Sequence, residues 1–400
     1  MNVEQKKIWI ATELFYPDET STAYILTKIA NSLADKFDIS IICGSAVYDK
    51  DKQSNNKFLE LSDKIKLIRK ESRFKNKNNL FAKFFNAVFF SVSFSAVLLR
   101  KIQKGDTVFI VTNPQILIIL LAIIKKIKTF RLVVLVHDVF PENTIPAKIF
   151  SSKHNIIYTF SKKIFDWAYS KADKLIVLGS DMKEVFEKKI SKYKNKTVIE
   201  VIENWAETDI VYPIKLPNDN DKICFLFAGN LGRLQGLDEF LSIIEHISNP
   251  HICFHFCGTG HMKDQLKSRV SNQDLSMITF GDSFSRSDQI NVLNQCDVAL
   301  VSIIDEMYGL CVPSKTYNIL AAGKPVLFIG HKNSEIAKLV EEHNIGFVFS
   351  FKETDSIINF FNGISLKDKE LFADMGNRAR ELALNSFSEK IILDKFRNVI

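Results

Sequence analysis

The sequence is poor in cysteine, and its cysteines lie apart from one another. Its 400 residues contain six cysteines, and no two of them form a Cys-x-x-Cys pair. Cys253 and Cys257 lie within an apolar run that has no neighbouring metal ligands, and the others are Cys43, Cys224, Cys296 and Cys311. This spacing argues against a disulfide framework and a structural zinc site, and it predicts reduced thiols in a cytosolic protein.

The glycine-rich loops that bind nucleotides in two large enzyme classes are also missing. A strand-like run at 8–11 continues into residues 12–22, which contain no glycine, so the Gly-x-Gly-x-x-Gly turn of dinucleotide-binding dehydrogenases is absent there. No segment matches the Gly-x-x-x-x-Gly-Lys-Ser/Thr loop of P-loop enzymes. Both classes are therefore disfavoured.

No apolar run is long enough to span a membrane without interruption. The first seven residues lead directly into the 8–11 run with no cleavable apolar segment, so we expect the chain to stay in the cytoplasm. The two most apolar stretches are 84–99, diluted by Asn86 and serines, and 108–124, interrupted by Asn113-Pro114. Basic residues border both stretches, which favours peripheral attachment to the inner face of the cytoplasmic membrane.

Charge divides the chain into two parts. Residues 1–205 carry 34 Lys/Arg against 21 Asp/Glu, a balance of +13, and the remainder carries 19 against 25, a balance of −6. A basic run at 63–77 precedes the Phe-rich stretch at 80–99, and it contains Lys64, Lys66, Arg69, Lys70, Arg73, Lys75 and Lys77. This combination suits an anionic membrane surface, and it also fits a buried helix beside a solvated loop.

Strand-like runs alternate with amphipathic helical runs along the chain, which predicts parallel sheets of βαβ units. The first series has strands at 8–11, 39–43, 66–68, 107–111, 132–136, 174–178 and 197–202, with helices at 22–36, 80–102 and 154–170. The second follows a proline-containing linker at 213–221, with strands at 223–228, 251–257, 277–280, 298–301, 326–329 and 346–349. We predict an α/β fold of two doubly wound, Rossmann-like domains, 1–205 and 206–385, facing a central cleft. A last helix at 386–400 is expected to cap one domain, with the N-terminal domain as its candidate partner.

Three segments of the second half form an ordered pattern. They are Phe225-Leu-Phe-Ala-Gly-Asn-Leu-Gly-Arg-Leu-Gln-Gly-Leu237, Phe256-Cys-Gly-Thr-Gly260 and Pro313-Ser-Lys-Thr-Tyr-Asn-Ile-Leu-Ala-Ala-Gly-Lys-Pro-Val326. Together they resemble the nucleotide-sugar-binding half of GT-B glycosyltransferases of the retaining family 4. With His137-Asp-Val-Phe-Pro-Glu142 and Glu203-Asn-Trp-Ala206, the whole chain resembles the bacterial surface-polysaccharide branch of that family, near the transferases of N-acetylfucosamine (FucNAc).

The resemblance implies a retaining, metal-independent transfer of a sugar from UDP to a polyprenyl-diphosphate-linked saccharide at the membrane, in polysaccharide, O-antigen or capsule biosynthesis. An N-acetylated deoxyhexosamine such as FucNAc is the implied sugar, and neither a cofactor nor a nucleic-acid partner is expected. The leaving diphosphate needs converging positive charge. We predict that Arg233 and Lys315 supply it. Arg233 lies in a turn with Gly232. Lys315 follows Pro313 at the start of a helix that Ser314 is expected to cap.

Other donor residues depart in part from the family pattern. Gly258 and Gly260 follow a strand and would let a base or ribose approach the backbone. Gln235 stands near a position where relatives carry a lysine, which places more weight on Lys315. Of the family's paired glutamates, alignment on the Ala-Ala-Gly-Lys-Pro segment puts Asn318 at the ribose-binding position. Alignment on the acidic-x-aromatic-Gly segment that begins the family's element, here Glu306-Met-Tyr-Gly309, instead puts Glu306 at the sugar-binding position. Eleven residues then separate Glu306 from Asn318, where seven separate the two glutamates in the family.

The first half supplies candidates for the transferred sugar and the acceptor. His137 and Asp138 end a strand, at the edge where doubly wound folds place their chemistry. The resemblance implies that they orient hydroxyls and stabilise positive character on the sugar ring. Hydroxyls at 20–22 replace the family's paired glycines, and they would either donate to phosphate or cap a helix. The predicted acceptor-binding residues are Glu13, Thr20, Ser21, Thr22 and Glu142.

Two other functions stay open from the sequence. A hydrolysing UDP-GlcNAc 2-epimerase shares the two-domain architecture but needs no lipid acceptor and no basic apolar face. A catalytically inactive, membrane-associated binding subunit would account for the degraded glutamate pair. Asp49-Lys-Asp51 and Asp219-Asn-Asp221 are Asp-x-Asp triplets of the kind that bind a metal in GT-A enzymes, but both lie in hydrophilic stretches and predict solvated turns.

Overall fold

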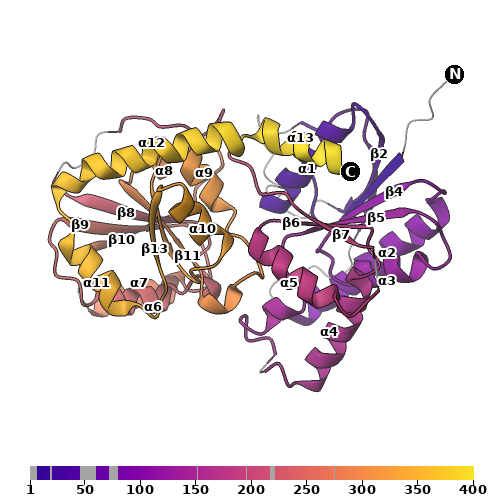
Figure 1. Cartoon of the computed structure of the whole chain (residues 1–400), viewed down its shortest axis with the longest axis horizontal. Helices are drawn as coiled ribbons and strands as arrows, with labels where there is room; N and C mark the ends of the chain where they lie inside the picture. The colour runs from indigo at the N-terminus through magenta and orange to yellow at the C-terminus, as the bar shows by residue number, and fades with distance from the viewer. Residues whose placement is uncertain are drawn as a thin grey trace.

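The computed structural model describes residues 7–18, 20–45, 60–71, 80–150, 152–194, 196–216, 221–273 and 275–400. In this part of the chain two α/β domains lie side by side, each built on one parallel sheet (Figure 1). The predicted fold class, with two Rossmann-like domains, is confirmed.

The N-terminal sheet has seven parallel strands in the order β3-β2-β1-β4-β5-β6-β7. Every residue of β4 is buried, because helices cover both faces of a parallel sheet and both must therefore be apolar. The strands are β1 (Lys7–Thr12), β2 (Asp38–Gly44), β3 (Lys66–Lys70), β4 (Thr107–Val111), β5 (Arg131–Val136), β6 (Lys174–Val177) and β7 (Val198–Val201).

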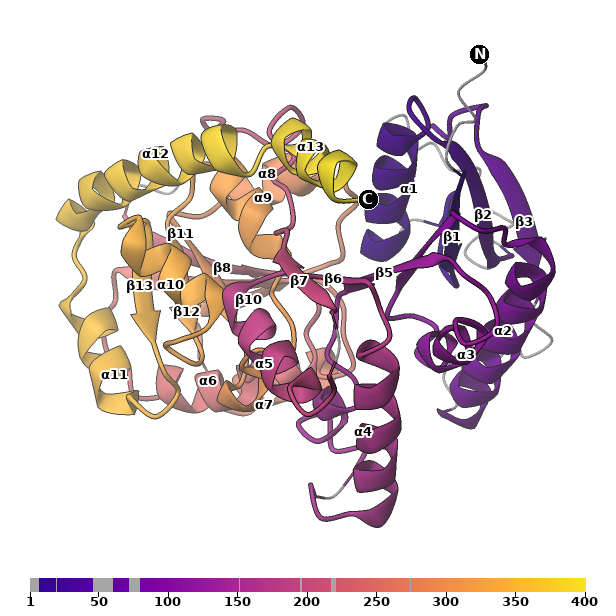
Figure 2. The same ribbon diagram turned by 45° about the vertical axis from the view of Figure 1, so that its right-hand side comes forward.

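The helices of this domain are α1 (Ser21–Leu33), α2 (Leu80–Lys101), α3 (Leu117–Ile124), α4 (Ile156–Tyr169) and α5 (Ser180–Ile190), with the 3-10 turn η1 (Glu142–Thr144). α3 packs between α2 and α4. In both views α4 extends away from the rest of the domain (Figures 1 and 2).

Four basic residues of the predicted basic run lie in the described structure, and the side chains of three of them contact other parts of the protein. Lys64 and Lys66 pair with Asp35 and Asp38, and Arg69 donates to the carbonyl oxygens of Gly44 and Tyr16. The rest of the run, Arg73, Lys75 and Lys77, lies outside the described residues.

α2 is long and apolar enough to cross a membrane by length and composition alone. Its window Phe84–Lys101 has a mean hydropathy of 1.3, and a third of that window is buried. Core helices of soluble proteins meet the same criteria. Phe90, Phe94 and Leu98 fill the domain core, whereas Phe84 and Val92 are exposed. α2 therefore serves the core with one face and presents apolar side chains on the other.

The C-terminal sheet has six parallel strands in the order β10-β9-β8-β11-β12-β13. They are β8 (Ile223–Ala228), β9 (Ile252–Cys257), β10 (Ile278–Gly281), β11 (Val298–Ser302), β12 (Val326–Ile329) and β13 (Gly346–Phe349). The helices are α6 (Leu237–Ile244), α7 (Lys263–Asn272), α8 (Gln289–Asn294), α9 (Lys315–Ala321), α10 (Glu335–Glu342), α11 (Thr354–Gly363) and α12 (Lys369–Ser386), with η2 (Arg233–Gln235), η3 (Asp305–Met307) and η4 (Leu366–Asp368). In both sheets the strand order reverses beside the first strand, which leaves a crevice at the carboxyl ends of the strands.

The chain returns to the N-terminal domain at its end. α13 (Glu389–Val399) continues from α12 and lies against α1 (Figure 1). Glu389 pairs with Lys28 at 3.0 Å, and Lys395 pairs with Glu203 at 2.7 Å. The amide of Ala206 donates to the carbonyl oxygen of Phe387 at 2.7 Å, so the two passages between the domains are hydrogen-bonded to each other.

Candidate functional site

The loops at the carboxyl ends of the two sheets meet at the domain boundary. The amide of Val139, after β5, donates to the carbonyl oxygen of Leu310, after β11, at 2.9 Å. Two cavities lie along this boundary, and both are lined by residues of both domains.

The larger cavity has a volume of about 140 Å³. The start of α1, the segment after β7, the residues around the start of α8 and the start of α9 surround it. It brings together four residues predicted from the sequence, Ser21 of one domain and Ser314, Lys315 and Asn318 of the other. Its other lining residues are Tyr24, Ile25, Asn204, Trp205, Glu207, Arg286 and Gln289.

Lys315 is the most unusual side chain of this cavity. Its Nζ is buried and has no hydrogen-bond partner among the described residues. The ammonium lies 3.5 Å from the centroid of the Phe227 ring. It is also 3.3 Å from the point that a Cβ on Gly229 would occupy, so a larger residue there would crowd it. Burial lowers the pKa of Lys315 to about 7. A buried cation without a counter-ion predicts that an anion binds here.

The glycine-containing loop after β8 lies beside Lys315 and is joined to the loop after β9. The amide of Leu231 donates to the Thr259 carbonyl oxygen at 2.7 Å. A Cβ on Gly258 would lie 1.9 Å from the carbonyl oxygen of Gly229, and one on Gly260 would lie 2.2 Å from that of Leu231; both glycines have positive φ. Their glycine identity is thus explained by loop packing, and a bound base or ribose is not needed to account for it.

Arg233 and Gln235 have different roles in this loop. Arg233 is exposed at the start of η2, and in the part of the chain that the structure describes its guanidinium forms no hydrogen bond or ion pair. Gln235 is used within the loop, since its Oε1 accepts from the amide of Gly232 at 3.1 Å. Arg233 is therefore available to a ligand, whereas Gln235 fixes the turn.

The predicted cap of α9 by Ser314 is wrong. The backbone of Ser314 is already helical, so its hydroxyl is not placed to accept from the first amides, and the side chain makes no capping hydrogen bond. Ser314 is exposed at the cavity wall, and Pro313 before it lines the smaller cavity.

Asn318 belongs to a polar network that sequence reasoning missed. Its Oδ1 accepts from the Glu207 amide at 2.9 Å, and its Nδ2 donates to the Glu207 carboxylate at 2.8 Å and to Gln289 at 3.0 Å. Arg286 pairs with the same carboxylate at 2.5 Å and stacks 3.6 Å from the centroid of the Tyr24 ring. Burial, and after it the Glu207 carboxylate, raise the pKa of Tyr24.

The only sequence signal for this network was indirect, because Glu207 directly follows the Glu203-Asn-Trp-Ala206 segment. Nothing in the sequence around Arg286 or Tyr24 marked either residue. In the fold, Glu207 places a carboxylate beside Asn318, the residue that this chain carries where the resemblance puts the second glutamate of the family pattern.

His137 and Asp138 lie directly after β5, at the domain boundary. Their amides both face the hydroxyl of Thr112, at 3.3 and 3.5 Å. The Nε2 of His137 is buried without a hydrogen-bond partner in the described structure, and burial lowers the pKa of this imidazole to about 4. Asp138 keeps accessible surface, but protein surrounds it on most sides and the resulting desolvation raises the pKa of its carboxyl. At neutral pH the site thus offers a neutral imidazole and a partly desolvated carboxylate.

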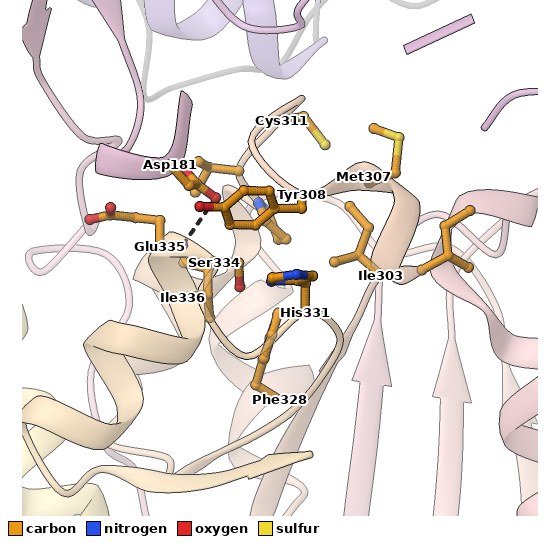
Figure 3. Close-up of a pocket in the computed structure, with 13 residues that line it drawn as sticks. Asp181, Ile303, Met307, Tyr308, Cys311, Phe328, His331, Ser334, Glu335 and Ile336 are labelled. Atoms are coloured by element: carbon orange, nitrogen blue, oxygen red, sulfur yellow. Dashed lines mark hydrogen bonds between the residues drawn. The ribbon is translucent and has the colours of Figure 1, made fainter. Parts of the chain in front are cut away.

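The smaller cavity, about 10 Å³, lies where α5 meets α10 (Figure 3). Asp181 of α5 accepts from the amide of Glu335 at 3.1 Å, and Glu335 of α10 accepts from the amide and hydroxyl of Ser180 at 2.6 and 2.8 Å. Each carboxylate therefore binds the first turn of the opposite helix. Burial raises the pKa of both carboxyls. Figure 3 also shows Tyr308 against His331, with ring centroids 4.2 Å apart.

Glu142 is not free to bind an acceptor, in contrast to the prediction. Its carboxylate pairs with Lys162 and Lys189, each at 2.6 Å. Lys189 also pairs with Asp166 at 2.8 Å, and both of these side chains are at most 2% exposed. Glu142 belongs to a buried ion cluster that joins η1, α4 and α5. A carboxylate after Phe-Pro in the sequence gave no sign of the lysines that the fold brings to it.

The remaining predicted residues have varied surroundings. Thr20 caps α1, because its hydroxyl accepts from the amide of Ala23 at 3.3 Å, which agrees with the helix-cap alternative for this loop. Thr22 and Glu13 are half-buried near the same edge of the sheet. Glu306 is exposed in η3, and its charge helps to raise the pKa of Glu239, after the larger effect of burial. Glu306 lines neither cavity.

The described residues contain no group of three or more His, Cys, Asp or Glu side chains that could hold a metal ion. Asp49 and Asp51 lie outside these residues, as does Asp219 of the second triplet.

Residues 208–382 match the profile of the family described as glycosyl transferases group 1. The probable glycosyltransferase WbjE of Pseudomonas aeruginosa is 32% identical over 329 residues, which cover 80% of each chain. WcaI of Escherichia coli strain K12, described as a glycosyl transferase of colanic acid biosynthesis, is 26% identical over 182 residues, 46% of this chain and 44% of WcaI.

Solved structures are similar over the whole chain. The sucrose-phosphate synthase of Thermosynechococcus elongatus aligns with a TM-score of 0.74 and 14% identity, covering 99% of this chain and 98% of that one. Anabaena HepE, solved in complex with UDP, aligns with a TM-score of 0.67 and 14% identity, covering 99% of each chain. At these identities the structures show the fold, and the match to WbjE shows the family. The chain therefore belongs to the glycosyl transferases group 1, with its two candidate cavities at the boundary of a GT-B fold.

Proposed function

We propose that this protein is a retaining glycosyltransferase that moves a sugar from UDP to a lipid-linked saccharide in the assembly of a bacterial surface polysaccharide, such as O-antigen or capsule. The observation that carries the proposal is the ammonium of Lys315, which lies beside the Gly229 loop in a cavity lined by both domains and is buried with no hydrogen-bond partner in the described residues. The donor sugar that we propose is an N-acetylated deoxyhexosamine such as FucNAc.

Lys315 and Arg233 are the proposed diphosphate ligands. When the glycosidic bond breaks, negative charge grows on the leaving diphosphate, and cations held beside it stabilise the transition state. Lys315 is held there in advance by the packing of Phe227 and α9, whereas Arg233 is exposed at η2 and would close on the ligand as a bidentate partner. Two protein cations offer a charge that a divalent metal provides in other transferases, so we propose a metal-independent reaction.

The larger cavity also offers groups for the nucleoside. The Glu207 carboxylate lies at its wall, held by Asn318 and Arg286 through one oxygen, while its Oε1 is buried without a hydrogen-bond partner in the described structure. A ribose hydroxyl is a donor that suits this oxygen. We propose that Glu207 takes over the ribose-binding function that the family assigns to the second glutamate. Ser21, from the opposite domain, would complete the contact once the cleft holds a donor.

His137 and Asp138 are proposed to act on the transferred sugar. A neutral imidazole can donate or accept one hydrogen bond to a sugar hydroxyl, and a carboxylate that protein surrounds on most sides stabilises positive character on the ring more strongly than one in bulk water. In a same-face, retaining transfer the leaving phosphate takes the proton of the acceptor hydroxyl, so no protein nucleophile is required of this site.

The acceptor and the location are proposed from the relatives and from the charge of the chain. WcaI is described as a glycosyl transferase of colanic acid biosynthesis. Residues 1–205, with their balance of +13, suit a polyprenyl-diphosphate acceptor on the cytoplasmic face of the membrane.

Titration calorimetry with UDP and with GDP, first in EDTA and then with magnesium, tests the donor site. We expect UDP to bind in EDTA. Lys315→Met should weaken UDP binding by about 2–4 kcal/mol, because it removes the buried positive charge that contacts the diphosphate. Lys267→Met is the matched control, since this lysine is exposed on α7. Equal UDP affinity in Lys315→Met and the parent protein would place the diphosphate elsewhere.

A second measurement separates the proposal from its alternatives. Incubation with UDP-FucNAc and a polyprenyl-diphosphate saccharide should give a lipid-linked product whose new linkage keeps the donor's anomeric configuration. UDP binding without transfer to any acceptor would favour an inactive binding subunit. Release of UDP and a 2-epimerised free sugar without lipid acceptor would favour an epimerase.

A further inference from the structure

We propose that the projecting end of α4 docks this protein on an anionic lipid surface. This α4 tip consists of the apolar side chains of Ile149, Ile156, Ile157 and Phe160 and the neighbouring Lys148, Lys153 and Lys163. The proposal deepens the proposed function, because it names the surface that would hold the enzyme beside a lipid-linked acceptor. Lipid binding itself can be measured without any turnover.

The apolar residues of the α4 tip are unusually exposed. Ile156 is 85% exposed, Ile157 and Phe160 are each 64% exposed, and Ile149 is 59% exposed. Four large apolar side chains within twelve residues form a patch, and such patches mark interaction sites on otherwise soluble proteins. The patch is exposed although the same helix also has a well-buried face, which includes Phe165.

The α4 tip is an ordered structure. Asn155 caps the helix, since its side chain accepts from the amides of Ile157 and Tyr158 at 2.9 and 3.3 Å. The buried Tyr158 packs edge-on against Phe150, with ring centroids 6.0 Å apart, and this contact holds the preceding loop against the helix. The apolar residues are thus presented on a preformed helix end, which lowers the entropy lost on insertion into a lipid surface.

The α4 tip extends beyond the edge of the sheet that carries the candidate site. α4 begins after the carboxyl end of β5, and Lys162 is held at that edge by its 2.6 Å pair with Glu142 in η1. Ile156 lies six residues before Lys162, which corresponds to about 9 Å along the helix. Figures 1 and 2 show the start of α4 projecting from the body of the molecule. A lipid surface bound there would lie on the side of the sheet edge that also bears His137 and Asp138.

Charge favours an anionic lipid over other occupants of this patch. Residues 80–163 contain 12 Lys/Arg and three Asp/Glu. Of the three acidic residues, Asp106 is buried, Glu142 is paired with lysines, and Asp138 lies at the domain boundary. Exposed apolar side chains flanked by exposed lysines are the combination that binds anionic interfaces, since the apolar groups insert and the lysines meet the headgroups.

α2 is the competing surface, because it too exposes apolar side chains and was expected from the sequence to attach to the membrane. Its exposed apolar residues spread along the helix and are at most 58% exposed; among those that the structure describes they are Phe84, Phe85, Val92 and Leu99. The apolar side chains of the α4 tip are more exposed and lie within a shorter stretch of chain. A direct comparison of variants in the two helices decides between them.

The test is co-sedimentation of the full chain with vesicles of phosphatidylcholine alone and with about 30 mol% phosphatidylglycerol added. We expect binding to the anionic vesicles that falls with added salt. The triple variant Ile156→Glu, Ile157→Glu, Phe160→Glu should bind them at least about tenfold more weakly, because it replaces apolar anchors by charges that anionic lipid repels. All three positions are exposed, so folding should persist, and a thermal melt checks this.

The controls are Leu371→Glu with Leu384→Glu, which place charges at exposed apolar sites on α12, and Val92→Glu on α2. Both should bind vesicles as the parent does. Parent-like binding of the triple variant, or loss of binding in Val92→Glu alone, would overturn the proposal. Absence of binding of the parent protein to anionic vesicles would also overturn it. The same holds if sedimentation velocity shows a dimer of the parent that the triple variant abolishes while vesicle binding is unchanged. UDP titration of each variant keeps these outcomes separate from the donor site, because it does not involve lipid.

Discussion

Binding of a UDP donor at pH 8 should take up close to one proton, and Lys315 should be the group that receives it. In the free protein burial lowers the pKa of Lys315 to about 7. A diphosphate beside the ammonium favours its charged form and should return the pKa toward the ordinary range. Binding therefore couples to protonation, and the coupling depends on pH in a way that the pKa fixes.

The magnitude follows from the two protonation states. With a pKa of about 7, roughly a tenth of Lys315 is charged at pH 8 and roughly nine tenths at pH 6. A fully charged complex thus takes up about 0.9 proton at pH 8 and about 0.1 at pH 6. The same lowered pKa makes the free energy of unfolding of the free protein depend on pH. The unfolded chain binds the extra proton between pH 7 and 10.5, so the destabilisation by Lys315 is complete below pH 7 and is relieved as pH rises.

Calorimetric titration with a UDP-sugar in two buffers of different ionisation enthalpy measures the proton count directly. A UDP-sugar is preferable to UDP because both of its phosphates are esterified and do not titrate near neutrality. Lys315→Met and Lys315→Arg should both abolish the uptake, the first by removing the amine and the second because a guanidinium stays charged. Uptake below about 0.2 proton at pH 8 in the parent, or unchanged uptake in Lys315→Met, would refute the reasoning.

Three further predictions follow from contacts in the two domains. Arg233→Ala should leave the melting temperature unchanged, because the side chain has no partner in the described structure. It should lower kcat/KM by an amount that corresponds to about 2–4 kcal/mol of lost transition-state stabilisation, and an unchanged kcat/KM would contradict the place of Arg233 at the diphosphate. Glu142→Gln should reduce the free energy of unfolding in urea by about 2–4 kcal/mol, because it leaves the buried Lys189 with less counter-charge. The KM for the acceptor should stay constant. A raised KM for the acceptor in a variant as stable as the parent would support the acceptor role for Glu142. Gly258→Ala should fold poorly or melt far below the parent, because its Cβ would lie 1.9 Å from a main-chain oxygen. Gly363→Ala is the control, since the position has open space around it. Equal melting temperatures of Gly258→Ala and the parent would show that the loop can shift.

The sequence predicted the fold closely. Buried parallel strands are short apolar runs, and the runs at 107–111 and 298–301 needed no tertiary information to be found. The alternation of strands and helices left one common architecture, and connections of this kind are right-handed and local. Helix ends were less certain, as Ser314 shows, because a cap depends on a backbone angle that the residue type does not fix.

The candidate site was predicted where a residue acts through a local motif and was missed where it acts through a distant neighbour. Lys315 and Arg233 lie in segments with a recognisable pattern, so their proposed roles were stated from sequence. Glu142 was assigned to the acceptor because nothing local reveals that Lys189, 47 positions later, reaches its carboxylate. Glu207 and Arg286 were missed for the same reason, since 79 positions separate the two residues of this ion pair.

The sequence by itself thus determined the strands, their order along the chain and the family, because periodicity and short motifs are properties of neighbouring residues. Only the tertiary structure decided which charges are paired and which are left free. It removed Glu142 from the site, occupied Asn318 with Glu207, and left the buried Lys315 without a partner in the described structure. It also showed that the apolar residues at the start of α4 face outward, although their composition would equally suit a core. Burial and pairing depend on what folding brings together from far along the chain, and both set the free energy of a charge.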